Sequence, residues 1–373
     1  MLPPFYETLF AAFAFILGAC IGSFLNVCIY RMPLGLSVNE PKRSFCPSCK
    51  YQIPLYHNIP LVTWLVLRGK CANCGGRISF RYFGVELLTG LLFLAVWLRV
   101  WAWGAPGWPL QAWVLALPYW IMVALFIAAT FIDFEHFIIP DEITIGGMVV
   151  GFLCSFAVPA LHGEKVAFRA LEKSFLGIVV GGGLIYLILR LGKLLFGKQN
   201  LDLPPNTRVV FSETALILPD KEIPYEDLFY RKTDVITLDA KTVELVDRCY
   251  RASRIRLSPA KLQIDEEEFN PEETPHLEVV TDTLSLPREA MGFGDVKFMA
   301  AIGAFLGWQA TIFSLMVSSV IGALVGVCLI LLKKQEWSSR LPYGPYIALA
   351  ATLWIFGGKG LLAWWLAGGG FSF

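Results

Sequence analysis

Two aspartates stand where long apolar stretches meet polar sequence. Asp295 follows Gly292 and Gly294 in the run Gly-Phe-Gly-Asp, just before an apolar stretch over residues 298–332, and Asp133 ends another apolar stretch. A carboxyl group at the edge of a hydrophobic segment is costly, so each aspartate is a candidate functional residue. The glycines leave room for another backbone, such as a substrate strand, to come close. The alternative is that each aspartate caps a helix.

Asp133 and Asp295 would do acid–base chemistry if the fold brought them together. Two adjacent carboxyl groups cannot both ionise easily, so they share a proton. One then acts as a base toward a water molecule, while the other acts as an acid toward a carbonyl oxygen and a leaving amine. This is the arrangement of aspartic proteases.

Four of the nine cysteines form two Cys-x-x-Cys knuckles, Cys46 with Cys49 and Cys71 with Cys74. Two such knuckles about twenty residues apart match the spacing of a tetrahedral four-thiolate zinc site. A closed site of this kind is structural rather than catalytic. The alternatives are two disulfides or free thiols, and a reducing cytoplasm disfavours the disulfides.

The composition indicates a membrane protein that crosses the bilayer several times. The chain of 373 residues is 56% hydrophobic and 16% charged, its mean hydropathy is +0.59, and soluble proteins carry about 25% charged residues. The net charge of +1 gives no indication of nucleic-acid binding. The first apolar stretch is too long for a cleaved signal peptide and is expected to be retained as a span.

The distribution of charge sets the expected topology. In residues 31–82 the single acid Glu40 stands against eight basic residues, namely Arg31, Lys42, Arg43, Lys50, Arg68, Lys70, Arg77 and Arg81. Short basic loops stay in the cytoplasm, so this loop is expected inside and the N-terminus outside.

The apolar stretches then predict eight spans with both termini outside. They are residues 5–30, 83–103, 112–132, 143–161, 174–196, a hairpin over 298–332 that turns near Gly307, and about 342–362. In this topology Asp133 and Asp295 lie at the cytoplasmic ends of their spans, at the same membrane depth.

Residues 197–288 differ from the rest, since they hold most of the acids and several short runs of β-forming residues. We therefore expect an all-α polytopic membrane protein with about eight transmembrane helices, a zinc-knuckle cytoplasmic loop and a small β-rich cytoplasmic insert. The expected divisions are the first transmembrane helix (1–30), the cytoplasmic four-cysteine loop (31–82), transmembrane helices two to five with Asp133 (83–196), the insert (197–288), and the Gly-x-Gly-Asp loop with helices six to eight (289–373).

Four other polar residues are candidates for supporting roles. Asn26 inside the first span is expected to hydrogen-bond a neighbouring helix, in preference to a direct role in the active site. Glu86 would either pair with an arginine of the loop or face a polar cavity near the active site. Asp141 can cap the helix that follows Pro140. Lys297 would either hold Asp295 in place or anchor helix ends.

Several of these segments resemble the type IV prepilin peptidases, a family of bacterial inner-membrane aspartyl proteases. The resemblance covers nearly the whole chain except 197–288. It rests on residues 22–33 (Gly-Ser-Phe-Leu-Asn-Val-Cys-Ile-Tyr-Arg-Met-Pro), the four cysteines, and residues 58–71, 81–90, 132–141 and 292–297.

The resemblance implies a function and a set of partners. It implies that Asp133 and Asp295 are the catalytic pair, that the enzyme lies in the bacterial inner membrane with its active site facing the cytoplasm, and that it removes the leader of type IV prepilins or of type II secretion pseudopilins. It also implies N-methylation of the new N-terminus with S-adenosylmethionine. The lipid bilayer is then a further partner, nucleic acid is not one, and the oligomeric state is left open.

Two positions depart from the usual pattern of the family. Thr63 stands where serine is common, and Glu135 stands where aspartate is common. Two alternative functions were weighed. A presenilin-type intramembrane aspartyl protease would share the Gly-x-Gly-Asp element but would not explain the four cysteines. A proton-coupled transporter would place acids at the bilayer midplane rather than at one face.

Overall fold

The structure is a computed structural model that describes residues 4–366, apart from 42, 47, 103–108, 230–233, 246–247, 272–273, 275, 288–291 and 333–340. The chain divides into two compact units. The helical unit comprises Met1–Tyr186 and Gly292–Phe373, and the sheet unit comprises Leu187–Met291. The domain boundary expected at 288/289 lies outside the described residues.

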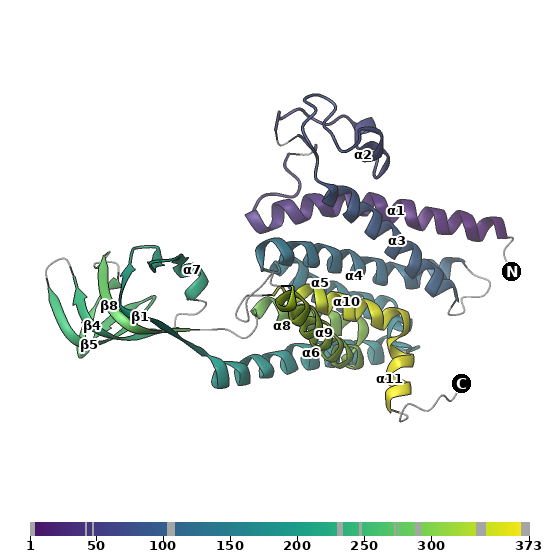
Figure 1. Cartoon of the computed structure of the whole chain (residues 1–373). Helices are drawn as coiled ribbons and strands as arrows, with labels where there is room; N and C mark the ends of the chain where they lie inside the picture. Colours follow the sequence, from purple (N-terminus) through teal and green to yellow (C-terminus); the bar gives the residue numbers. More distant parts are fainter. Residues whose placement is uncertain are drawn as a thin grey trace. The chain divides into compact units, whose positions relative to one another are not determined.

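The helical unit consists mainly of long apolar helices, among which α1 packs along α3 (Figure 1). One of them, α6, begins in this unit and ends in the sheet unit. Its elements are α1 (Pro4–Arg31), η1 (Met32–Leu34), η2 (Leu55–His57), α2 (Val62–Val66), α3 (Phe80–Ala102), α4 (Pro109–His136), α5 (Asp141–Ala157), η3 (Pro159–His162), α6 (Ala167–Phe196), α8 (Phe293–Leu306), α9 (Trp308–Leu331), α10 (Gly344–Leu353), η5 (Trp354–Gly358) and α11 (Lys359–Leu366).

Six helices of the described part are long and apolar enough to cross a membrane, whereas the sequence predicted about eight. The six are Glu7–Leu34, Phe80–Ala102, Gln111–His136, Ala167–Leu194, Trp308–Leu331 and Gly344–Trp364. The two remaining predicted spans correspond to α5, with 17 residues, and α8, with 14 residues. At a rise of 1.5 Å per residue these helices are about 26 and 21 Å long, less than the ~30 Å of a hydrocarbon core.

The short helix α8 is held by close contacts through small residues. Gly151 of α5 packs on Phe305, where an added Cβ would lie 2.8 Å from the ring. Gly177 of α6 and Gly303 of α8 meet backbone to backbone, so neither position has room for a side chain. Gly307, with φ of 81°, separates α8 from α9, which confirms the predicted turn near this residue. These contacts fix the helix that carries Asp295 in its first turn.

The sheet unit contains one antiparallel sheet of eight strands in the order β3-β2-β1-β8-β4-β5-β6-β7. Its elements are β1 (Lys198–Phe211), β2 (Ala215–Ile217), β3 (Glu222–Pro224), α7 (Tyr225–Leu228), β4 (Ile236–Glu244), β5 (Cys249–Ser258), β6 (Lys261–Ile264), β7 (Glu267–Phe269) and β8 (Leu277–Pro287). The predicted β-rich insert is therefore confirmed.

The sheet owes its order to a core of its own. Residues alternate between buried and exposed along the central strands, as in β8, because one face packs on apolar side chains while the other faces solvent. Val209, Ile255 and Val279 are fully buried in that core. The unit thus has the hydrophobic cluster that a stable antiparallel sheet requires.

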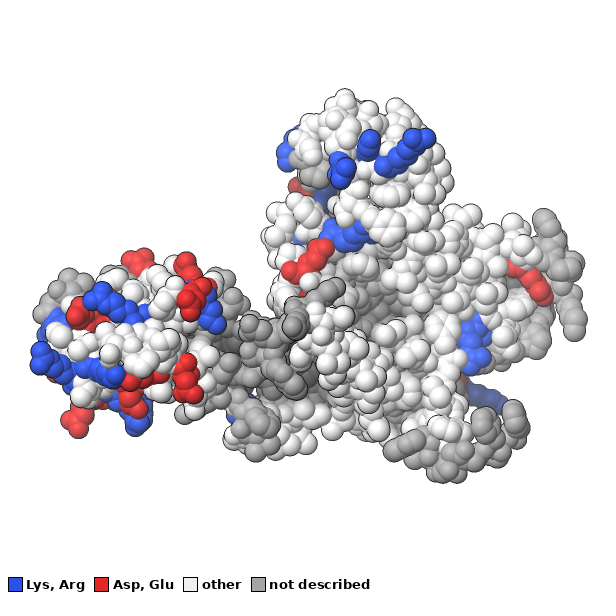
Figure 2. All heavy atoms as spheres, viewed as in Figure 1, with Lys and Arg blue, Asp and Glu red and all other residues white. Residues whose placement is uncertain are grey.

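The charged residues are distributed differently over the two units. Figure 2 shows Lys and Arg side chains gathered over the loop that holds the four cysteines, and few charges over the long helices. Over the sheet unit, acidic and basic side chains are intermixed. The basic character expected of the loop is thus visible on its surface.

Candidate active site

Asp133 lies near the C-terminal end of α4, where its side chain is buried (5% exposed). Its Oδ2 accepts a hydrogen bond of 2.8 Å from the backbone N–H of Gly344. Gly344 is the first residue of α10, and unpaired N–H groups at a helix N-terminus favour a negative charge nearby. The environment of Asp133 is therefore suited to a carboxylate.

Asp295 lies in the first turn of α8 and is also buried (8% exposed). Gly292 precedes this helix in an extended conformation, and the backbone N–H of Asp295 donates to its carbonyl oxygen at 3.2 Å. Asp133 is close enough for its charge to act on Asp295. The structure thus brings together the two aspartates that the sequence singled out.

Ile139 is the residue on which the two aspartate-bearing segments meet. It lies in the connection between α4 and α5 and is 7% exposed. Gly294 packs on it, since an added Cβ there would lie 3.4 Å from the Cβ of Ile139. Gly344 packs on its other end, where an added Cβ would lie 3.0 Å from Cδ1 of Ile139 and 2.8 Å from Oδ2 of Asp133. The absence of side chains at Gly294 and Gly344 therefore sets the approach of the segments.

Lys297 connects the same two segments from the outer side. Its Nζ donates to Oδ1 of Asp141 at 2.5 Å and lies 5.2 Å from the centre of the Phe293 ring. Of the two roles considered for Lys297, the structure shows the anchoring of helix ends, because its partner is Asp141 and not Asp295. The expectation that Asp141 caps a helix is wrong. Pro140 occupies the N-cap position of α5, and Asp141 is the first helical residue.

Glu86 and Asn26 lie where α1, α3 and the cysteine-bearing loop meet. Glu86 accepts a hydrogen bond of 2.7 Å from the backbone N–H of Leu61, so its partner is a loop amide and not the arginine that was one of its two predicted alternatives. Asn26 donates to the carbonyl oxygen of Tyr82 at 3.0 Å, which confirms its role in joining two helices. The Oδ1 atom of Asn26 is buried and has no hydrogen-bond partner among the described residues.

The four cysteines converge on one point. Their Sγ atoms all lie within 4.8 Å of one another. The distance is 3.8 Å between Cys46 and Cys74, and 4.0 Å between Cys49 and Cys71. In a tetrahedral site with Zn–S bonds of about 2.3 Å the sulfurs are about 3.8 Å apart. The cluster has the size that a zinc ion requires.

The backbone around the knuckles favours thiolates, the form that binds metal. The N–H groups of Cys49 and Ser48 lower the pKa of Cys46 to about 6. The N–H of Tyr51 and the amide of Asn73 lower the pKa of Cys49 below its usual value. The N–H of Gly76 acts in the same direction on Cys74, but the neighbouring thiols raise the pKa of Cys74 to about 11. The donor set and its surroundings thus fit the structural zinc site that the spacing predicted.

Two residues of the site were missed from the sequence. Ile139 looks like any apolar residue of a loop. Gly344 lies in the run Pro-Tyr-Gly-Pro at the start of the last predicted span, and this unusual run was the available signal. What the sequence could not show is that its glycine amide reaches a carboxylate 211 positions away.

Known proteins resemble this chain along most of its length. The profile of the Type IV leader peptidase family matches residues 120–199 and 279–327, and that of the Bacterial Peptidase A24 N-terminal domain matches residues 16–100. The interval between the two segments of the first match holds most of the sheet. No solved structure matches significantly.

Three relatives, each named prepilin leader peptidase/N-methyltransferase, illustrate the similarity. The relative from Myxococcus xanthus is 42% identical over 207 residues, which cover 52% of this chain and 58% of that protein. The one from Aeromonas hydrophila is 29% identical over 385 residues, covering 96% and 94%. The one from Neisseria gonorrhoeae is 34% identical over 225 residues, covering 54% and 71%. The chain belongs to the type IV leader peptidase family.

Proposed function

We propose that this protein is an aspartyl endopeptidase that removes the leader peptide of type IV prepilins or type II secretion pseudopilins and then N-methylates the new N-terminal residue. One observation carries the peptidase activity: Asp133 and Asp295 are both buried, and the segments that carry them meet on Ile139, where Gly294 and Gly344 allow a close approach. The names of the relatives support both activities.

We assign the role of general base to Asp133, because the N–H of Gly344 stabilises its negative charge. Asp295 carries the shared proton. Asp133 takes a proton from water as the water oxygen attacks the carbonyl carbon of the scissile bond, and Asp295 gives its proton to the carbonyl oxygen. Asp133 then passes its proton to the leaving nitrogen as the C–N bond breaks, and Asp295 regains its own. The substrate segment must be extended, since a helical segment keeps its carbonyls internally bonded. Gly292 leaves room for it, because an added Cβ there would meet nothing closer than Oδ2 of Asp295 at 3.5 Å, whereas Gly294 is packed on Ile139.

The proposed location is the bacterial inner membrane, with the cysteine-bearing loop and the carboxyl pair on the cytoplasmic side. The basic residues of the loop favour this orientation. We place α5 and α8 in the membrane as well, which gives eight spans. The short length of α8 puts Asp295 somewhat below the membrane surface, in protein rather than in lipid.

Two bound groups accompany this function. Zinc held by Cys46, Cys49, Cys71 and Cys74 would order the loop without taking part in the chemistry. S-adenosylmethionine supplies the methyl group when bound. Its ammonium and hydroxyl groups need acceptors, and the unpartnered Oδ1 of Asn26, with the Glu86 carboxylate on the adjoining face of α3, fits that need. These side chains would hold and orient the polar groups of the donor.

The test uses the purified protein in detergent with a full-length prepilin, with and without S-adenosylmethionine. The masses of both products are measured. We expect a cut just before the hydrophobic helix in both samples, and an added methyl group on the mature N-terminus only when the donor is present. An intact prepilin after incubation would refute the peptidase, and an unmodified amine from an active enzyme would refute the methyltransferase.

A further inference from the structure

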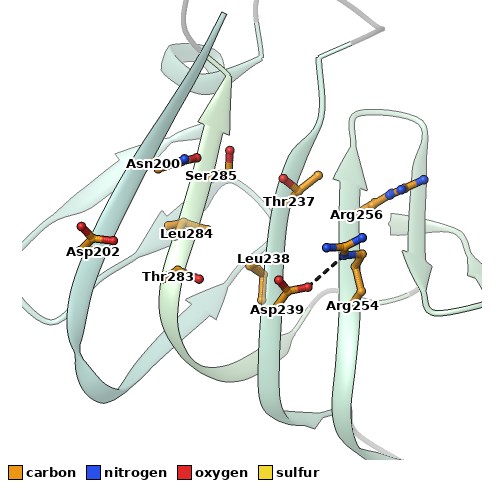
Figure 3. Close-up of a pocket in the computed structure, with 10 residues that line it drawn as sticks. All are labelled: Asn200, Asp202, Thr237, Leu238, Asp239, Arg254, Arg256, Thr283, Leu284 and Ser285. Carbon is orange, nitrogen blue, oxygen red and sulfur yellow. Dashed lines mark hydrogen bonds and ion pairs between the residues drawn. The ribbon is translucent and has the colours of Figure 1, made fainter.

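The sheet unit carries a hollow on the face opposite its core. The hollow has a volume of about 380 Å³, within the range of small-ligand and peptide sites. It crosses β1, β8, β4 and β5, which are consecutive in the sheet. Figure 3 shows the side chains that line it. They are Asn200, Asp202, Thr237, Leu238, Asp239, Arg254, Arg256, Thr283, Leu284 and Ser285. We call this hollow the polar groove.

The polar groove is formed by irregularities in the sheet. The pairing of β1 with β8 shifts register after Asp202, and the pairing of β4 with β8 shifts after Leu238. Such bulges bend strands and redirect side chains. Both shifts lie beside Thr281, which is fully buried and whose hydroxyl lies 2.9 Å from the carbonyl oxygen of Asp239 and 2.8 Å from that of Thr283. An internal hydrogen bond therefore fixes the concave shape.

A row of hydrogen-bonding side chains crosses the groove. The strand register pairs Asn200 with Ser285, Ser285 with Thr237, and Thr237 with Arg256. Directly paired residues point to the same face of a sheet. Amide and hydroxyl groups both donate and accept hydrogen bonds, and a peptide backbone, with its N–H and C=O groups, needs both.

The charges of the groove are arranged at its two sides (Figure 3). Arg254 is neutralised by Asp239, with Nε 2.9 Å from Oδ1. Asp202 on β1 and Arg256 on β5 have no ion pair or side-chain hydrogen bond among the described residues. Three strand spacings separate β1 from β5, which is about 14 Å and corresponds to about four residues of extended chain. A ligand that pairs with both charges has a cationic group at the end near Asp202 and an anionic group at the end near Arg256.

This charge arrangement distinguishes between classes of ligand. A phosphate-rich ligand or an anionic membrane surface would meet the carboxylates of Asp202 and Asp239 as well as the arginines, which disfavours both. An extended peptide with charges of opposite sign about four residues apart complements the two unpaired charges and the row of amide and hydroxyl groups. Only residues 288–291 separate β8 from Gly292 in the sequence, so the groove belongs to a segment inserted next to the proposed catalytic loop.

We propose that the polar groove binds an extended, polar peptide segment of the substrate that lies outside the membrane. In the bound peptide a basic side chain would pair with Asp202 and an acidic side chain with Arg256. The inference rests on the proposed function, because it takes the substrate to be the prepilin that the carboxyl pair cuts. The groove contributes binding and does not take part in the chemistry.

The first experiment measures cleavage kinetics of the full-length enzyme with full-length prepilin. The double variant Asp202→Asn, Arg256→Gln is compared with the control Asp220→Asn, Arg251→Gln, which removes the same charges from exposed positions of the same unit outside the groove. We expect KM to rise about tenfold with kcat unchanged in the groove variant, because a loss of uniform binding raises KM alone. The control should match the wild type. An unchanged KM in the groove variant would overturn the inference.

The second experiment separates this inference from the proposed function. A fluorescent synthetic peptide with the sequence of the polar segment of the same prepilin is titrated with the full-length enzyme, and its anisotropy is recorded. Peptide binding that is lost in the groove variant and kept in the control supports the proposed binding site. If that result is found but the prepilin is not cut, the proposed function fails and the binding site stands. Equal binding by both variants, or no binding by the wild type, would overturn the groove.

Discussion

The helical unit and the sheet unit place their charged side chains in opposite ways. In the helical unit Asp133 and Asp295 are buried, and Asp133 is held by a specific backbone contact. In the sheet unit the side chains of Arg254 and Asp239 are 63% and 69% exposed, outside a cluster of apolar side chains. The sheet unit also holds a buried carboxylate, Asp234, but this one forms an ion pair of 2.7 Å with Lys193. Burying a carboxyl group is costly, whereas an exposed ion pair contributes ~0–1 kcal/mol. Removal of Asp133 or Asp295 should therefore stop the chemistry, whereas removal of one exposed charge outside the polar groove should have little effect.

The largest expected effect is the loss of leader cleavage in the Asp133→Asn variant and in the Asp295→Asn variant. An amide can neither take the proton from water nor give one up, so each substitution should lower the rate by at least ~10³-fold. The amide has the size of the carboxyl group, so both variants should insert in the membrane at wild-type levels. Cleavage is followed by the mobility shift of a prepilin.

The matched control is Asp220→Asn, which removes an exposed carboxylate of the sheet unit outside the polar groove. It should cut at the wild-type rate because the loss of one solvated surface charge costs little. Cleavage by either catalytic-site variant within tenfold of the wild type would refute the acid–base pair and remove the contrast between the units.

The next effect is on the zinc content and the protease resistance of the cysteine-bearing loop, compared with the sheet. The sheet has an apolar core, whereas the cysteine-bearing loop has four thiols placed where a zinc ion would order it. We expect about one equivalent of zinc in the purified protein, and none after Cys46→Ser with Cys49→Ser. The loop of that variant should be cut rapidly by a protease while the sheet stays resistant.

The control replaces Cys249, an exposed cysteine of the sheet unit, by serine. It should keep the zinc and the resistance of the loop. A zinc content that stayed the same without Cys46 and Cys49 would show that the metal is bound elsewhere.

A smaller effect is expected from Gly344→Ala. The added Cβ would lie 2.8 Å from Oδ2 of Asp133, so the carboxylate or the start of α10 must shift. We expect kcat to fall by roughly 10–100-fold with KM retained, since small displacements of catalytic groups cost about this much. Gly360→Ala is the control, because nothing lies within 4 Å of the added atom. Normal kcat in Gly344→Ala would show that its contact with Asp133 does not position the base.

The elements that the sequence predicted are those whose signals are local. The two cysteine knuckles, the turn at Gly307 and the alternation of β8 each lie within a short stretch. Asp133 and Asp295 were found because a carboxyl group next to an apolar segment is costly wherever its partner lies.

What the sequence did not show depends on contacts between distant positions. Asp141 fits the local rule for a helix cap, yet its partner Lys297 is 156 positions away. An arginine was one of the two environments predicted for Glu86, but the fold of the loop presents the amide of Leu61 instead. Backbone amides leave no trace in a sequence pattern, so contacts of this kind come only from the structure.

A modest effect is expected from Lys297→Met and from Asp141→Asn. The pair is partly exposed, with 25% and 60% of the side chains accessible, so its loss should cost up to ~1 kcal/mol and slow cleavage about two- to fivefold. Because each substitution breaks the same contact, the double variant should be no slower than the slower single one. Fully additive effects on the rate would show that the two residues act separately.

The smallest effect on cleavage is expected from Val279→Ala in the sheet unit. Val279 is fully buried in β8 at the centre of the sheet, so the substitution leaves a cavity and should destabilise this unit by about 2 kcal/mol. Hydrogen exchange of the strand amides would measure that loss, with Ile217→Ala as the control because Ile217 is 39% exposed. The sheet stays folded, and the polar groove lies on its other face, so kcat and KM should remain within twofold of the wild type. A large loss of kcat would mean that the carboxyl pair depends on the order of the sheet. The contrast between a unit that does the chemistry and a unit that holds the substrate would then have to be abandoned.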